Sequence, residues 1–339
     1  MRNSLLMAAL IFLAGSLGVH AQQYAVSGRI PLEGDGGWDY LLADSTNGQL
    51  YVSLGTQVDV VDLASEKPTG IITGMKHIHG IAVADDLNRG FISDGGDDAV
   101  IIFDLKSRLV LQKVPTGKNP DGILYDPFSQ RVFAFNGRSN DVTAIDAASG
   151  KVAGTIPLGG KPEFPVSDGK GNVYVNIEDK SEISQIDPQA LKVKKVWPLS
   201  PCEEPSGLAM DKEGRRLFSV CSNNKMAVMN ADSGQVITTV VIGNGPDAAA
   251  FDPGTKLVFS SNGEGSLTVV RQDSADQYAV LATIPTQRSA RTMALDPKTH
   301  KIYLSAAKFG DTPAATAENP HPRPKIVPGS FQVLVLSPH

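Results

Sequence analysis

The chain has 339 residues, of which 41% are hydrophobic and 20% are charged, and it contains 33 Gly and 22 Pro. This composition is typical of a globular protein rich in turns, and it excludes a disordered or fibrous chain. The formal net charge of −5 argues against a protein whose main partner is nucleic acid or an anionic membrane. We therefore expect a globular fold and do not expect a nucleic-acid partner.

The first segment of the chain has the pattern of a secretory signal peptide. Arg2 precedes an apolar run from Leu5 to Leu17, and Val19-His20-Ala21 supplies a small-x-small cleavage pattern. The apolar run is short for a membrane span, so an uncleaved anchor is the less favoured alternative. The pattern predicts a signal peptide over residues 1–21 with cleavage after Ala21. We expect a periplasmic or secreted protein with no membrane span in the mature chain.

Seven strands centred on an aromatic residue follow at intervals of 40 to 44 residues. The anchors are Tyr51, Phe91, Phe133, Tyr174, Phe218, Phe259 and Tyr303. Before each anchor an Asp stands in a predicted turn, and the set is Asp44, Asp85, Asp126, Asp168, Asp211, Asp252 and Asp296. After each anchor come further short strands, such as VDVVDLAS and KVAGTIPLG. Four short strands in each unit of about 40 residues are the pattern of a β-propeller blade.

The repeat predicts an all-β, seven-bladed propeller over residues 22–339, with four strands in each blade. Near the start of the predicted mature chain stands YAVSGRIPL, which is similar to the fourth-strand segment KVAGTIPLG, and near its end stands FQVLVLS, which is similar to a third strand. The N-terminal strand is therefore expected to complete the last blade and close the ring, which removes exposed sheet edges. An open solenoid of the same repeats is the alternative.

These units resemble a known family. The anchors YVSL, YVNI and FSSN, each preceded by a turn of the Asp-Pro type and followed by a strand of the V-x-V-I-D type, are similar to the repeats of the YncE-like (YVTN-repeat) secreted bacterial β-propellers. The resemblance covers essentially the whole mature chain, although no unit spells YVTN. It implies the propeller fold, and functions that range among related propellers from binding scaffolds to lactonases and lyases.

Aligning the seven units brings one residue of each to the predicted mouth of the central channel. This ring consists of Asp39, His79, Asp121, Glu163, Ser206, Asp247 and Arg291. Convergent polar groups in a concave site are typical of a ligand site. Because propeller channels also hold water, polar residues there do not require a ligand. We interpret the ring as the candidate ligand-binding site.

His77 and His79 are the sharpest local feature, because residues two apart on a strand share a face. Imidazole is a common metal ligand, and Asp121 and Glu163 from the next blades are plausible partners. A divalent metal held by His77, His79, Asp121 and Glu163 is the alternative to a site without metal or other cofactor. The latter is favoured, because a His-x-His pair is more often two ordinary strand residues.

The two cysteines of the chain, Cys202 and Cys221, both lie in the fifth unit. The alignment places them on antiparallel neighbouring strands and on the same face. In an oxidising compartment this arrangement predicts a structural disulfide, with two free thiols as the alternative.

One segment departs from the repeat. Residues 306–330 form a Pro-rich loop about twenty residues longer than its counterparts, on the same face as the ring. Such a segment either extends freely or lies over the channel, where Lys308, His321 and Arg323 would add cations to an acidic mouth.

The leading hypothesis is a secreted, monomeric binding module that recognises a small molecule, a polymer or a protein at its loop-rich face and channel. The chain contains no nucleophile elbow, zinc-protease motif or phosphate-binding loop, so no catalytic residue is assigned. The alternative is a metal-dependent lactonase, hydrolase or lyase that acts in the channel.

Overall fold

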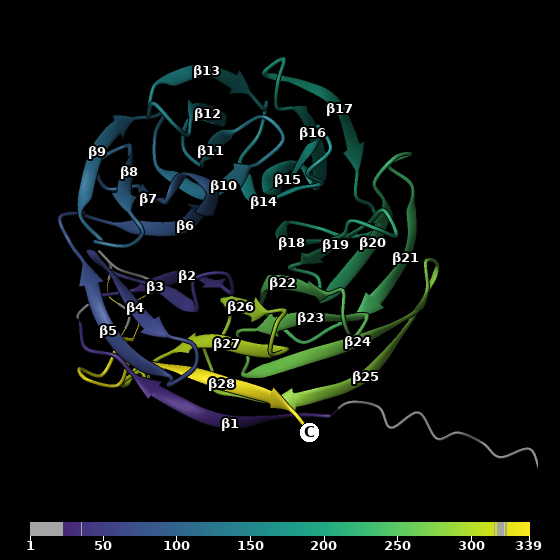
Figure 1. Ribbon diagram of the computed structural model, residues 1–339. Helices are drawn as coiled ribbons and strands as arrows, with labels where there is room; N and C mark the ends of the chain where they lie inside the picture. Colours follow the sequence, from purple (N-terminus) through teal and green to yellow (C-terminus); the bar gives the residue numbers. More distant parts are fainter. Residues whose placement is uncertain (1–22, 35, 315, 317–321, 323) are drawn as a thin grey trace, which may run out of the picture.

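The chain folds into seven four-stranded antiparallel sheets arranged around a central channel (Figure 1). The computed structural model describes residues 23–34, 36–314, 316, 322 and 324–339, so the predicted signal peptide and the side chains of His321 and Arg323 lie outside the described residues. Each innermost strand contacts the innermost strands of both neighbouring blades, including the first and the last. The ring is therefore closed, and the seven-bladed prediction is confirmed.

The innermost strands line the channel and are β2 (Trp38–Asp44), β6 (Ile78–Ala84), β10 (Pro120–Asp126), β14 (Pro162–Ser167), β18 (Pro205–Asp211), β22 (Pro246–Asp252) and β26 (Met293–Asp296). The second strands are β3 (Gln49–Leu54), β7 (Arg89–Asp94), β11 (Arg131–Asn136), β15 (Val173–Ile177), β19 (Arg216–Cys221), β23 (Leu257–Asn262) and β27 (Lys301–Ala306).

The third strands are β4 (Gln57–Asp62), β8 (Ala99–Asp104), β12 (Asp141–Asp146), β16 (Glu182–Asp187), β20 (Lys225–Asn230), β24 (Ser266–Ser274) and β28 (Gln332–Pro338). The outer strands are β5 (Lys67–Ile72), β9 (Val110–Pro115), β13 (Val152–Pro157), β17 (Lys192–Pro198), β21 (Val236–Val241), β25 (Gln277–Pro285) and β1 (Tyr24–Pro31). Two short 3₁₀ turns, η1 (Asp85–Leu87) and η2 (Glu178–Lys180), interrupt the pattern. No helix of the described chain is long and apolar enough to cross a membrane.

The core lies between adjacent blades, and the repeated aromatic residues fill it. All seven anchors, from Tyr51 to Tyr303, are at most 1% exposed. They stand on the second strand of each blade, where both faces of the sheet are covered by a neighbouring blade. Burial of each such side chain contributes about 1.5–3 kcal/mol to the free energy of unfolding. The sequence period therefore corresponds to one aromatic residue in each interface between blades.

The Asp residues that precede the anchors hold tight turns. Asp126 accepts a hydrogen bond from the backbone N–H of Ser129 at 2.9 Å, and Asp252 accepts one from Gly254 at 2.9 Å. Asp44 binds the backbone of Asn47 in the same way, at 3.0 Å. These side chains satisfy backbone donors that a turn would otherwise leave unpaired.

The N-terminal strand completes the last blade, as predicted. β1 pairs antiparallel with β28 from Tyr24 opposite Pro338 to Pro31 opposite Gln332, with a bulge between Val26 and Gly28. The order of this sheet is β1-β28-β27-β26, so the outer strand comes from the start of the chain and the other three from its end (Figure 1). Closure of the ring thus rests on hydrogen bonds between the two ends of the described chain.

The predicted disulfide is present in the fifth blade. Cys202, in the loop before β18, is bonded to Cys221 at the end of β19, with a Cα–Cα distance of 5.7 Å. Both residues are buried among the apolar side chains that separate the fourth and fifth blades. The bond fixes the loop that enters the innermost strand of this blade.

Candidate ligand site at the channel mouth

The predicted ring residues share one position in the blade. Six of them are the second residue of an innermost strand, namely Asp39, His79, Asp121, Glu163, Ser206 and Asp247. In each of these blades the pairing of the innermost strand with the second strand is irregular at this position. Such a bulge re-aims side chains, which turns the ring residue toward the channel. The seventh residue, Arg291, lies two residues before β26.

Hydrogen bonds between blades fix the backbone of the ring. The hydroxyl of Ser93 donates to the carbonyl of Asp121 at 2.6 Å, and the amide of Asn176 donates to the carbonyl of Ser206 at 2.8 Å. The hydroxyl of Ser206 in turn donates to the carbonyl of Pro246 at 3.2 Å. Ser206 therefore joins two blades with the same hydroxyl that the sequence assigned to ligand binding.

Asp39, His79 and Asp121 form the most compact cluster of the ring. His79 Nδ1 lies 2.7 Å from Asp39 Oδ2 and 3.7 Å from Asp121 Oδ1. Burial opposes protonation of His79, which is 8% exposed, but the hydrogen bond to Asp39 and the charge of Asp121 outweigh it and raise the pKa of the imidazole. One ligand atom from each of the three residues lies within 4.8 Å of the others. This spacing suits a single bound cation.

The other predicted metal ligands have different surroundings. The ring of His77 contacts the ring of His79, with centroids 4.7 Å apart, but burial and the neighbouring imidazole lower the pKa of His77. Glu163 pairs with Lys161 at 2.7 Å. Of the described residues, the cluster with metal-ligand spacing contains Asp39 in place of His77 and Glu163. Sequence reasoning included Asp39 in the ring but did not assign it to the metal.

Three carboxyl groups of the ring have raised pKa values, and Asp121 and Glu163 are neighbours. Burial and the charge of Asp39 raise the pKa of Asp121 to about 6, although the charge of His79 opposes this. Burial and the charge of Asp121 raise the pKa of Glu163 to about 8 against the effect of Lys161. Raised carboxyl pKa values show that the neighbouring cations do not compensate the buried negative charge.

Asp247 and Arg291 form an ion pair on the opposite side of the ring, with Arg291 Nη1 at 2.7 Å from Asp247 Oδ2. Burial nevertheless raises the pKa of Asp247 to about 6, with contributions from the charges of Asp39 and Asp121. The carboxylates of the ring therefore act on one another across the channel. A cation bound at any one carboxylate would lower the free-energy cost of ionising the others. The ring therefore behaves electrostatically as one site.

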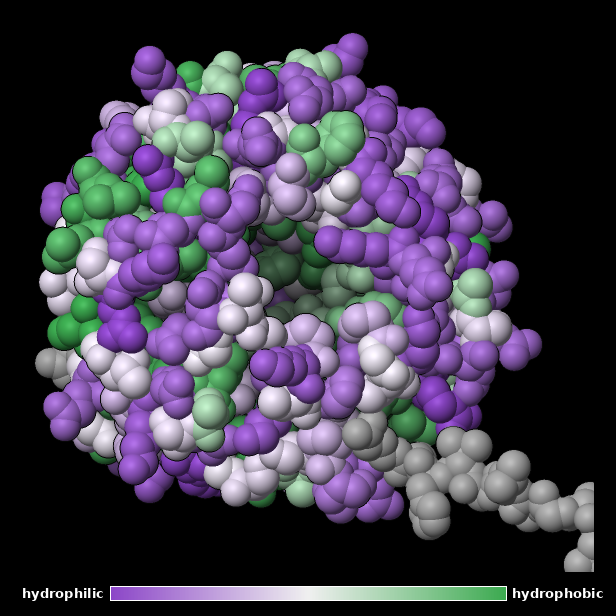
Figure 2. Space-filling view, viewed as in Figure 1, coloured by the Kyte–Doolittle hydropathy of each residue, from purple (hydrophilic) through white to green (hydrophobic). Residues whose placement is uncertain are grey.

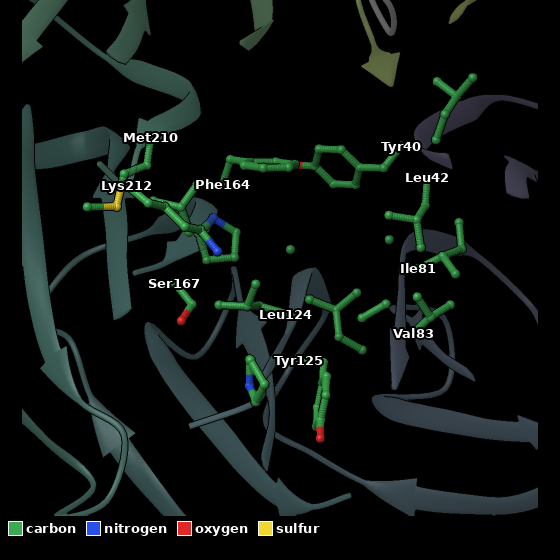
Figure 3. Close-up of a pocket in the computed structure, with 18 residues that line it drawn as sticks. Tyr40, Leu42, Ile81, Val83, Leu124, Tyr125, Phe164, Ser167, Met210 and Lys212 are labelled. Atoms are coloured by element: carbon green, nitrogen blue, oxygen red, sulfur yellow. The ribbon is translucent and has the colours of Figure 1, made fainter. Parts of the chain in front are cut away.

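An aromatic pair lies directly beneath the carboxylates. Tyr40 follows Asp39 and Phe164 follows Glu163, and the two rings meet across the channel with centroids 5.3 Å apart (Figure 3). The corresponding residues of the two blades between them are Gly80 and Gly122, which leave room for both rings. Burial and the surrounding carboxylates, Asp121 first, raise the pKa of Tyr40 well above its usual value. Sequence reasoning missed this pair, although two aromatics among small residues at one blade position were a visible signal.

Below the aromatic pair the channel is mainly apolar, although Tyr125, Ser167 and Lys212 also line it. A cavity of about 360 Å³ is lined by both rings and by side chains that include Leu42, Ile81 and Val83 (Figure 3). A hollow with hydrophobic residues inside it and hydrophilic residues at its rim is visible at the centre of the ring (Figure 2). The channel therefore changes from acidic to apolar at the level of Tyr40 and Phe164.

Comparison with known proteins identifies the fold and leaves the ligand open. The WD40 repeats of RRP9 superpose with a TM-score of 0.77 at 9% identity, over 93% of this chain and 100% of that chain. The structure of U3-55K superposes with a TM-score of 0.75 at 9% identity, over 92% of this chain and 99% of that chain. A chain of the mitotic checkpoint complex superposes with a TM-score of 0.75 at 13% identity, over 99% of both chains. No family model and no curated protein matches the sequence. The chain is a β-propeller of the kind that WD40 proteins share.

Proposed function

We propose that this protein is a binding module whose channel mouth recognises a small organic cation, such as an ammonium group. The observation that carries the proposal is the pair of largely buried carboxyls, Asp121 and Glu163, whose pKa values are raised to about 6 and about 8. A ligand that brings positive charge would remove the penalty of ionising them. The cationic group of the ligand would supply the positive charge that the carboxylates of the ring lack.

The aromatic pair supports a carbon-bearing cation. The rings of Tyr40 and Phe164 contact each other directly beneath the carboxylates of the ring. An ammonium group over an aromatic face gains about 0.5–2 kcal/mol beyond its contacts with carboxylates. The apolar cavity beneath, of about 360 Å³, would accommodate a hydrocarbon part of the ligand. A propeller of this kind commonly serves as an interaction module, which agrees with a binding role.

The predicted location outside the cytoplasm belongs to this proposal. The buried Cys202–Cys221 disulfide supports it, since such bonds persist in oxidising compartments. The signal peptide over residues 1–21 remains a sequence-based prediction.

The experiment compares choline with 3,3-dimethylbutan-1-ol, its uncharged carbon isostere, by titration calorimetry at pH 6 and pH 9. We expect choline to bind at least about 10-fold more tightly than the alcohol, and more tightly at pH 9, because Glu163 must lose its proton. Glu163→Gln should remove most of the pH dependence. Glu213→Gln is the matched control, since Glu213 is exposed on another face. Equal binding of the two probes, or no binding of choline, would contradict the proposal.

A metal-dependent hydrolase is the second candidate, and the spacing of Asp39, His79 and Asp121 favours it. One nitrogen and two carboxylate ligands fit a divalent ion such as zinc or manganese and leave a coordination position open. Such an ion would supply a water of lowered pKa to a lactone or ester. The chain's own residues would position the substrate against the apolar cavity.

Metal analysis by mass spectrometry separates the two candidates. The purified protein is measured before and after dialysis against a chelator, together with His79→Ala and Asp39→Asn. His300→Ala is the matched control, because His300 also pairs with an aspartate, Asp252 of the sixth blade, at 2.7 Å, but lies in the turn between β26 and β27 of the last blade. Stoichiometric metal that is lost only in the two ring variants would favour the hydrolase. Absence of metal from all samples would leave the organic cation as the ligand.

A further inference from the structure

The long loop of the last blade forms a second cavity beside the channel mouth. Phe309 and Ile326 pair as an isolated bridge, flanked by hydrogen bonds from Gly310 N to Lys325 O at 2.9 Å and from Val327 N to Lys308 O at 2.8 Å. We call these two paired stretches, residues 308–310 and 325–327, the ribbon. Between the ribbon and the rim of the channel lies a cavity of about 990 Å³, the ribbon pocket.

The ribbon is seated on the first blade. The ring of Trp38, at the start of β2, lies 5.9 Å from the ring of Phe309 and 5.5 Å from that of Phe331. These aromatic contacts hold the base of the loop against the rim. The sequence left open whether this loop extends freely or lies over the channel, and its described part lies against the propeller. Trp38, Phe309 and Ile326 form an apolar wall of the pocket.

The charge of the ribbon pocket is opposite to that of the ring. Among the described residues, its lining includes Arg288, Arg291 and Lys308 and contains no carboxylate. Arg291 is paired with Asp247, whereas the side chains of Arg288 and Lys308 form no ion pair with any described residue. In a chain with a net charge of −5, two cations that pair with no described carboxylate, next to a third that is paired, are a local exception. Such a site concentrates anions.

We propose that the ribbon pocket binds a small anion with an apolar body, through a carboxylate or a phosphate monoester. Arg288 and Lys308 would bind the anionic group, since arginine pairs with planar and tetrahedral oxyanions through two parallel hydrogen bonds. Trp38 and Phe309 would contact the apolar body. The cavity volume lies within the range of small-molecule sites. The pocket shares Arg291 with the ring, but the groups proposed to bind the anion, Arg288 and Lys308, lie outside the ring, so the proposal does not depend on the cation site.

Trp38 allows the pocket to be observed directly. The chain has two tryptophans, and the other, Trp197, is buried between the fourth and fifth blades against Tyr174. Trp197→Phe therefore leaves Trp38 as the single tryptophan. This variant is titrated with cyclohexanecarboxylate, cyclohexyl phosphate and cyclohexylmethanol, which do not absorb where tryptophan is excited. Calorimetry on the unmodified protein gives the same affinities without the substitution.

We expect a saturable change in Trp38 fluorescence with at least one of the two anions, and binding of the alcohol that is at least 10-fold weaker. The ratio of the affinities for the carboxylate and the phosphate shows which oxyanion the pocket prefers. Arg288→Gln combined with Lys308→Gln should weaken anion binding at least 10-fold, while Arg288→Lys with Lys308→Arg should retain it. Lys298→Gln, in an exposed turn of the same blade, is the control. Equal binding of alcohol and anions, or no binding of either anion, would overturn the proposal.

Discussion

At the scale of single residues, Glu163 determines how the channel mouth responds to pH. Its carboxyl is largely buried near Asp121, and its pKa is raised from 4.5 to about 8. Between these two pH values the folded protein keeps a proton that the unfolded chain has released. A raised carboxyl pKa therefore makes the free energy of unfolding fall as the pH rises through this interval.

The first prediction concerns the variant Glu163→Gln. Because glutamine cannot ionise, the fall in melting temperature between pH 5 and pH 8 should be smaller in the variant than in the unmodified protein, and the variant should be the more stable of the two at pH 8. Differential scanning calorimetry at several pH values measures this. Asp121 and Asp247, whose pKa values are also raised, contribute in the same direction in both proteins, so the difference between the curves reports Glu163 together with its interaction with Asp121. Parallel curves would show that Glu163 ionises normally.

The partners of the ring residues could not have been predicted from the sequence. The alignment of repeats correctly brought Asp39, His79 and Asp121 to one end of the channel. Which of them touch depends on the irregular pairing at the start of each innermost strand, and a bulge of this kind leaves no regular trace in a pattern of alternating residues. The hydrogen bond of 2.7 Å between His79 and Asp39 is a product of that local backbone.

At the scale of elements, several innermost strands approach one another closely because a small residue follows the ring position in four blades, namely Gly80, Gly122, Gly207 and Ala248. A Cβ atom added to Gly122 would lie 2.7 Å from the carbonyl oxygen of Glu163 in the next blade. At Gly207 it would lie 2.6 Å from the carbonyl oxygen of Asp247. Backbone atoms cannot move aside as a flexible side chain does. These glycines therefore set the diameter of the ring and hold the carboxylates near one another.

The second prediction compares Gly122→Ala with Gly37→Ala. The first substitution should lower the free energy of unfolding by about 1–3 kcal/mol, since it forces two strands apart. The second should change it by no more than about 0.5 kcal/mol, because no atom lies within 4 Å of the added Cβ. Urea denaturation followed by circular dichroism gives both values. Similar effects of the two substitutions would mean that the close approach does not limit the packing of the blades.

At the scale of the whole molecule, the repeat was the most predictable feature and the long loop the least. Each aromatic anchor must be buried between two blades, so the period of the sequence follows from a physical requirement. Residues 306–330 obey no such period. Their seating depends on contacts of Phe309 and Phe331 with Trp38, which is about 270 to 290 residues away in the chain. A contact of this separation has no local sequence signal, and the ribbon pocket was therefore not predicted.

The closure of the ring rests on β1, whose first residue, Tyr24, is anchored in the last interface between blades. Its ring contacts Phe259 edge-on at 5.1 Å, and its hydroxyl donates to the carbonyl of His300 at 2.9 Å. The side chain is 5% exposed. β1 is the outer strand of a blade whose other three strands come from the C-terminal part of the chain. Loss of the Tyr24 side chain should therefore weaken the interface between this blade and the sixth blade.

The third prediction follows for Tyr24→Ala, which should lower the free energy of unfolding by about 3–5 kcal/mol. Its distinguishing effect should be faster amide hydrogen exchange in β1 and β28 than in the other blades, because the end strands separate before the rest of the ring unfolds. Tyr278→Ala is the matched control. Tyr278 lies on the outer strand of the sixth blade, contacts Phe218 at 5.7 Å and takes no part in closure. If both variants accelerated exchange evenly around the ring, the propeller would unfold as one unit, and closure by β1 would contribute no more than any other outer strand.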